Sequence, residues 1–112
     1  RNIMFVNLEG WRIKSKRDIE DLGRVLTAAC KKTGKRVNSV INQNHFRIAE
    51  DLYDDYTAAI EDVLTEYSIT TARYTTSAFM RLKMQTSLFE RGVRPHIFES
   101  SEEARRAVQN AQ

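Results

Sequence analysis

Short apolar runs alternate with longer amphipathic stretches along the whole chain, and this alternation limits the fold more than any other feature of the sequence. The runs predicted to be strands are Ile3–Leu8, Val37–Asn42, Ile69–Tyr74 and His96–Phe98. Runs of this length, rich in apolar or β-branched residues, are typical of strands buried in a sheet. After each of them, apolar residues recur at the three- and four-residue spacing of an α-helix.

Capping residues predict where the helices begin and end. Ser15–Asp18 and Ser100–Glu103 follow the pattern of a capping box, and Thr75–Ser77 offers hydroxyl groups for a third helix start. Gly34 and Gly92 follow helical stretches, where glycine ends a helix readily. The order is therefore β-α-β-α-β-α-β-α. It predicts an α/β fold with a four-stranded, mainly parallel sheet and right-handed crossovers, in one domain over residues 1–112.

Composition excludes several classes of protein. The single cysteine, Cys30, makes no internal disulfide and no cysteine-based metal site. We therefore expect the protein to be located in the cytoplasm, which is reducing. We expect Cys30 to be a buried structural thiol beside the apolar stripe of the first helix. No apolar run approaches the roughly 20 residues needed to cross a bilayer, so we expect no membrane partner.

The charges are segregated along the chain. Residues 12–36 carry nine Lys or Arg against three Asp or Glu, whereas residues 50–66 carry seven acidic residues and no basic one. One interpretation is that the pattern reflects two helix faces exposed to solvent. The more specific alternative is a docking surface for a partner or another domain. We expect no nucleic-acid partner, because the basic residues do not alternate with aromatic side chains that could stack on bases.

Two polar segments follow predicted strands and are the candidate sites. The first is a loop with Asn42, Asn44 and His45, which either forms a polar site with His45 as an acid–base group or is an exposed Asn-rich turn. The second is the strand-to-helix junction. There, hydroxyl and backbone N–H groups suit an anion, and arginines add charge-assisted bonds. Its candidate contact or anion-binding residues are Arg73, Thr75, Thr76, Ser77 and Arg81. The alternative is that this junction only caps a helix, with Phe79 packed in the core.

Other sequence signals of chemistry are missing. Four glycines cannot form a phosphate-binding loop of either common spacing, and two histidines far apart in sequence give no metal signature. We therefore expect no cofactor and no metal. Trp11 lies in a loop after Gly10 and either anchors a neighbouring domain or folds back onto the core.

Several stretches together resemble one enzyme family. They are Ile3–Gly10, Val40–Ile48, Pro95–Ala104 and, most specifically, the Arg-Tyr-Thr-Thr-Ser-Ala-Phe sequence of Arg73–Phe79. Nearly the whole chain resembles the C-terminal extension of bacterial acyl-CoA:acetate/3-ketoacid CoA transferases of the propionate CoA-transferase type. The resemblance implies a parent enzyme that moves CoA between an acyl-CoA and a carboxylic acid.

The chemistry implied by this resemblance requires a residue that the chain does not contain. In that family a glutamate attacks the acyl-CoA thioester and becomes a glutamyl-CoA thioester, which is covalent catalysis by a carboxylate. The glutamate belongs to a Glu-x-Gly-x-x-Gly stretch, and Glu9-Gly10-Trp11 lacks that spacing. We therefore expect an accessory domain that is inactive alone. Its partners would be the remaining domains of the parent and a further copy of itself, with acyl-CoA bound by the parent. The start at Arg1, close to a strand, also favours a fragment of a longer chain.

The β-α order also resembles the STAS fold of anti-sigma-factor antagonists. In that family a serine at a strand-to-helix junction is phosphorylated in an Asp-Ser-[Ser/Thr]-Gly setting. Thr76-Ser77-Ala78 occupies the corresponding junction but lacks the Asp and the Gly. Three hypotheses remain: an accessory CoA-transferase domain, a stand-alone STAS-like binding or regulatory module, and a small enzyme using His45 and the Asn loop.

Overall fold

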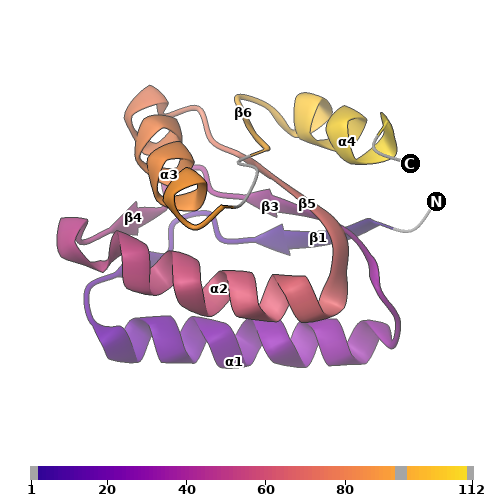
Figure 1. The fold of residues 1–112 in the computed structure, drawn as a ribbon, viewed down its shortest axis with the longest axis horizontal. Helices are drawn as coiled ribbons and strands as arrows, with labels where there is room; N and C mark the ends of the chain where they lie inside the picture. The colour runs from indigo at the N-terminus through magenta and orange to yellow at the C-terminus, as the bar shows by residue number, and fades with distance from the viewer. Residues whose placement is uncertain (1–2, 93–95, 111–112) are drawn as a thin grey trace.

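Four parallel strands form the central sheet, as the sequence predicted. In the computed structural model, which describes residues 3–92 and 96–110, the strand order is β1-β3-β5-β6 (Figure 1). The strands are β1 (Ile3–Asn7), β3 (Val37–Asn42), β5 (Ser68–Tyr74) and β6 (Ile97–Phe98). Every pairing between them is parallel, and the arrangement is consistent with a STAS-like α/β fold. His96, predicted to lie in the fourth strand, lies just before β6 with a φ of 39°, and Pro95, which precedes it, lies outside the described residues.

The described residues form four α-helices, which cover the two faces of the sheet unequally. They are α1 (Lys16–Thr33), α2 (Tyr53–Tyr67), α3 (Ala78–Glu90) and α4 (Ser101–Asn110). Right-handed crossovers between strands added in one direction place α1, α2 and α3 on the same face. Figure 1 shows α1 and α2 side by side along one side of the sheet and α4 on the other.

The predicted capping residues make the bonds expected of them. Ser15 Oγ accepts the backbone N–H of Asp18 at 3.3 Å, and Ser100 Oγ accepts that of Glu103 at 3.2 Å. Gly34 ends α1 with a φ of 79°, a left-handed conformation in which glycine has no Cβ to clash. Local sequence chemistry therefore fixes these helix ends.

A small second sheet was not predicted. It pairs β2 (Arg12–Ile13) with β4 (Arg47–Ile48) in parallel, and a short 3-10 helix, η1 (Glu50–Leu52), then leads into α2. Two-residue strands carry no readable periodicity, so sequence patterns do not reveal them. The pairing holds the loops after β1 and β3 together and places Ile13 in the core.

The face covered by α1, α2 and α3 holds most of the core. Its largest fully buried apolar side chains are Ile13, Leu22, Ile41, Ile60 and Met84. The face covered by α4 holds a smaller cluster, formed by Val40, Ala72, Ala104 and Val108. Trp11 is partly buried against the larger core, so it folds back. Cys30 is buried there too, as expected, and burial raises the pKa of its thiol.

Candidate functional site

The two polar segments predicted from the sequence meet at the carboxyl edge of the sheet. Carboxyl ends of parallel strands lie along one edge, which is where ligands bind in open α/β sheets. Asn44, after β3, accepts the backbone N–H of Thr76, after β5, through its Oδ1 at 2.8 Å. The Asn-rich loop and the strand-to-helix junction are therefore one continuous polar edge.

Asn42 extends this network to the end of β1. Its Nδ2 donates to Asn7 Oδ1 at 3.2 Å and to Glu9 Oε1 at 3.1 Å, and its Oδ1 accepts the N–H of Asn44 at 2.9 Å. The side chains join three successive strand ends. The geometry gives Asn42 and Asn44 a clear structural role at this edge.

His45 lies exposed beside this network. Its φ of 57° is in the left-handed region, which a non-glycine residue adopts mainly in turns. In the described part of the chain, it forms no hydrogen bond with a nucleophile or a carboxylate. An acid–base role for His45 stays a prediction.

The hydroxyl groups of the junction cap α3. Ser77 Oγ accepts the N–H of Met80 at 3.1 Å, and Thr75 Oγ1 accepts the N–H of Ser77 at 3.2 Å. Arg81 turns back and donates from Nη1 to the carbonyl oxygen of Thr75 at 2.7 Å. These contacts match the helix-capping interpretation. Binding of an anion by Thr75, Thr76, Ser77 or Arg81 stays a prediction.

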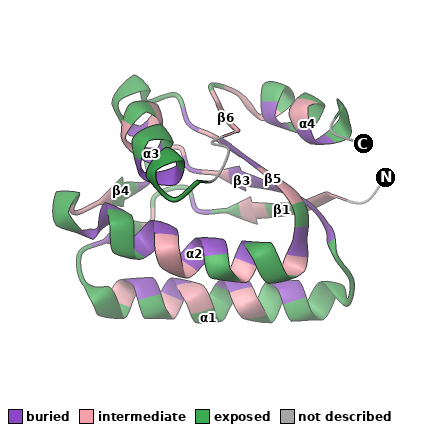
Figure 2. Cartoon of the chain, viewed as in Figure 1, coloured by how far each residue is buried: buried purple, intermediate pink, exposed green. Residues whose placement is uncertain are grey.

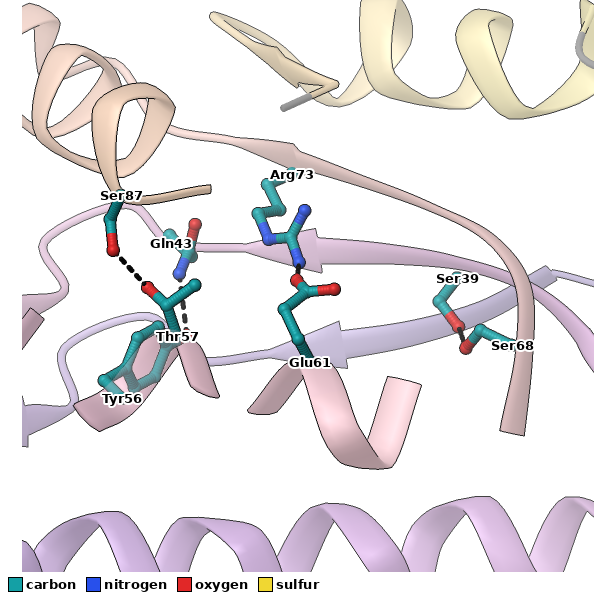
Figure 3. Close-up of polar contacts among 8 residues, drawn as sticks. All are labelled: Ser39, Gln43, Tyr56, Thr57, Glu61, Ser68, Arg73 and Ser87. Carbon is teal, nitrogen blue, oxygen red and sulfur yellow. Dashed lines mark hydrogen bonds and ion pairs between the residues drawn. The ribbon is translucent and has the colours of Figure 1, made fainter. Parts of the chain in front are cut away.

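Arg73 lies apart from the junction, in the protein interior. It is buried and forms an ion pair with Glu61 of α2, and Figure 3 shows the two side chains facing each other between the helix and the sheet. Sequence analysis grouped Arg73 with the junction and missed this partner. The available signal was Glu61 itself, a charged residue between Ile60 and Leu64 of a buried stripe, where a charge needs a partner.

A layer of buried polar side chains continues from this ion pair. Ser87 Oγ donates to Thr57 Oγ1 at 2.9 Å, and Gln43 Nε2 donates to the hydroxyl oxygen of Tyr56 at 2.9 Å (Figure 3). The pKa of Tyr56 is raised to about 12, mainly because the side chain is buried. The Gln43 Oε1 atom has no hydrogen-bond partner within the described residues. Sequence analysis did not predict this layer, because single polar residues in apolar stripes give no distinct pattern.

The outer side of α3 carries three large apolar residues among exposed polar ones such as Gln85 and Thr86. Met80, Met84 and Leu88 are buried whereas Phe79 is exposed, so the packed Phe79 of the helix-capping alternative is wrong. Phe79, Leu82 and Phe89 are instead 65%, 63% and 76% exposed, and we call these three residues the α3 stripe. Figure 2 shows exposed surface along much of this helix. Large apolar side chains on the solvent side of a helix depart from the usual amphipathic pattern, in which that side is polar.

The charge segregation seen in the sequence is partly internal to the fold. The basic helix α1 and the acidic helix α2 lie side by side, and Lys16 approaches Asp55 to 3.9 Å (Figure 1). At the other end of α2, Arg36 Nη2 donates to the carbonyl oxygen of Ser68 at 2.7 Å. Opposite charges on neighbouring helices therefore account for part of the pattern without any partner.

Metal and membrane signatures are missing from the part of the chain that the structure describes. No group of three or more His, Cys, Asp or Glu residues there could hold a metal ion. None of the described helices combines the length and the apolarity needed to cross a membrane. Comparison with family models, with curated proteins and with solved structures found no match to this chain.

Proposed function

We propose that this chain is an accessory domain of a cytoplasmic CoA transferase and that it docks onto the catalytic part of that enzyme through the α3 stripe. The parent enzyme moves CoA between an acyl-CoA and a carboxylic acid through a glutamyl-CoA thioester formed outside this chain. The family assignment rests on the sequence resemblance, which is strongest over Arg73–Phe79.

The observation that carries the docking role is the exposure of Phe79, Leu82 and Phe89 on one helix. Phe79 and Leu82 lie one turn apart, and Phe89 lies two turns beyond Leu82 on the same side of the helix. Large apolar side chains gathered on one exposed face mark interaction sites, whereas single scattered ones need no explanation. The stripe begins at Phe79, within the stretch that most resembles the family. Phe79 lies two residues after Ser77, the cap of α3, so a domain docked at this end of α3 would lie close to the polar edge.

The polar edge supports a structural role in the assembled enzyme. Its side chains hold strand ends together or cap α3, and the chain lacks the Glu-x-Gly-x-x-Gly stretch of the family's nucleophile. Of the two arginines predicted to meet an anion, Arg73 is buried against Glu61, and Arg81 donates to the carbonyl oxygen of Thr75. We expect the isolated domain to bind free CoA weakly or not at all, and calorimetric binding at micromolar affinity would contradict that.

The test begins with the reading frame that encodes this chain. Several hundred upstream codons that include Glu-x-Gly-x-x-Gly support the proposal, and a start codon directly before Arg1 contradicts it. The catalytic part and the 112-residue chain are then produced as separate polypeptides. We expect them to co-purify, and we expect Phe79→Ser combined with Phe89→Ser to separate them. Val25→Ser is the matched control, because Val25 is also an exposed apolar residue but lies on α1.

A stand-alone STAS-like regulatory module is the second candidate, favoured by the observed strand order and by Ser77 at the strand-to-helix junction. Phosphate on Ser77 would lie at the start of α3, where the helix dipole favours negative charge. In this case the chain binds its partner without any CoA-transferase domains. A Ser77→Asp change that switches partner binding on or off would favour this candidate.

A further inference from the structure

The exposed edge of β1 lacks the features that usually protect an edge strand. In the part of the chain that the structure describes, β1 pairs only with β3 and its other side has no strand neighbour. Edge strands are commonly protected by Lys, Pro or a bulge. The β1 sequence Ile-Met-Phe-Val-Asn has no charge and no proline, and its pairing with β3 has no register shift. Phe5, at its centre, is 60% exposed.

The backbone groups that face this edge are arranged symmetrically about Phe5. The N–H of Leu8 donates to the carbonyl of Asn42 at 2.9 Å, as part of the β1–β3 ladder. Backbone groups of alternate residues in a strand point to opposite sides, so those of Ile3, Phe5 and Asn7 point away from β3. These three residues form a set with Phe5 in the middle.

We propose that a second copy of this chain pairs with this edge, β1 against β1 in antiparallel orientation, around a two-fold axis beside Phe5. In that register Phe5 exchanges both backbone hydrogen bonds with Phe5 of the second copy, and Ile3 exchanges its own with Asn7. The two four-stranded sheets become one continuous sheet. A two-fold interface of this kind uses the same surface on both copies, so no other partner is required.

Side-chain packing and charge both favour this occupant. Phe5 pairs with Val40, which lies on the α4 face, and Phe5 is largely exposed there, whereas Ile3 packs against the α4 cluster. A groove of about 590 Å³ lies at the start of β1, and its lining includes Ile3, Met4, Phe5, Thr33, Lys35 and Arg105. A two-fold axis perpendicular to the sheet places both Phe5 rings on this face. It also brings Glu9, beyond the end of one β1, towards Lys35 and Arg105 at the start of the other.

Sedimentation equilibrium of the 112-residue chain tests this pairing. We expect a monomer–dimer equilibrium, and we expect Phe5→Lys to raise the dissociation constant by roughly thirtyfold or more, as for loss of a central interface residue. Val25→Lys is the matched control, because it places the same charge at a similarly exposed apolar residue on α1, and Phe79→Lys tests the α3 stripe as the alternative interface. A wild-type chain that stays monomeric at all concentrations would overturn the proposal. Dissociation caused by Phe79→Lys and not by Phe5→Lys would also overturn it, and would assign the dimer to α3.

A cross-linking experiment tests the register without a charge on the strand. In a Cys30→Ala background, Phe5→Cys places two thiols opposite each other, with Cα atoms about 5.5 Å apart, within the range that a disulfide spans. We expect mild oxidation to give a covalent dimer. Val25→Cys on α1 should stay monomeric under the same conditions. Equal cross-linking of both variants, or none at Phe5→Cys, contradicts the β1 pairing. Neither result bears on the CoA-transferase proposal, which depends on α3 and on the parent reading frame.

Discussion

The two faces of the sheet differ in how completely helices cover them. Three helices cover one face and bury both its large apolar core and the ion pair of Glu61 with Arg73. Only α4 covers the other, over a small cluster, and Phe5 is left exposed beside it. The first face therefore supplies most of the stability, whereas the partly covered face and the outer side of α3 carry the contacts that we propose with other chains or domains.

On the well-covered face, we expect the largest loss of stability when the buried ion pair is broken. Glu61→Ala removes the carboxylate from a buried guanidinium, and we expect a loss of about 3–5 kcal/mol in the free energy of unfolding. Denaturant unfolding measures this loss. Replacing both Glu61 and Arg73 with Met should recover most of it, because no buried charge is then left. A loss below about 1 kcal/mol in Glu61→Ala would show that the pair is solvated.

Substitutions at two neighbouring residues of β3 allow the contributions of the two faces to stability to be compared directly. Ile41 points into the large core and Val40 into the α4 cluster, and both are fully buried. We expect Ile41→Ala to cost about 3–4 kcal/mol and Val40→Ala about 2 kcal/mol or less, since fewer atoms are lost and α4 can move to fill the space. Chemical denaturation of the two variants checks the order. A larger loss of stability for Val40→Ala than for Ile41→Ala would contradict the proposed difference between the faces.

Because Tyr56 is buried under the well-covered face, we expect the stability of the protein to depend on pH in the alkaline range. Burial raises the pKa of Tyr56 from about 10 to about 12 in the folded protein. The folded state therefore holds this proton more tightly than the unfolded state. The resulting stability is fully present below pH 10 and is lost as the pH rises from about 10 to 12, by roughly 2–3 kcal/mol at most.

Urea unfolding from pH 8 to pH 11 checks this prediction, with Tyr56→Phe as the control. The control loses the hydrogen bond from Gln43, so it should be about 1 kcal/mol less stable at pH 8. Its stability should then fall less steeply above pH 10 than that of the unmodified chain. Identical pH profiles for the two proteins would contradict a titration of Tyr56 linked to folding.

We expect the smallest losses of stability from removing helix caps. One capped helix from each face can be compared in this way. Ser77 caps α3 and Ser100 caps α4, and replacing either with Ala should cost about 1 kcal/mol. In hydrogen exchange, we expect Ser100→Ala to speed exchange mainly within α4, because this helix packs on a small core. Ser77→Ala should lower protection more widely. Uniform loss of protection in Ser100→Ala would mean that α4 unfolds together with the main core.

Much of the fold follows from local sequence, while the site follows from it only in part. Ser15, Gly34 and Ser100 predicted helix ends, because a cap depends on residues within one turn. The meeting of Asn44 with Thr76 follows from the parallel topology, although the particular hydrogen bond does not. Glu61 in an apolar stripe indicated a buried charge, but its pairing with Arg73 could not be predicted, since the residue facing Glu61 depends on how α2 crosses β5. Phe79 was misplaced because a helix with apolar residues on two sides does not indicate which side is buried.

We infer that this chain is the accessory domain of an enzyme whose covalent chemistry occurs elsewhere. The most direct measurement is peptide-mapping mass spectrometry of the polypeptide encoded by the complete reading frame, after incubation with acetyl-CoA. We predict a CoA thioester on a glutamate that lies outside residues 1–112. A CoA adduct on a residue within this chain, or neither an adduct nor CoA transfer by the complete polypeptide, would contradict the claim.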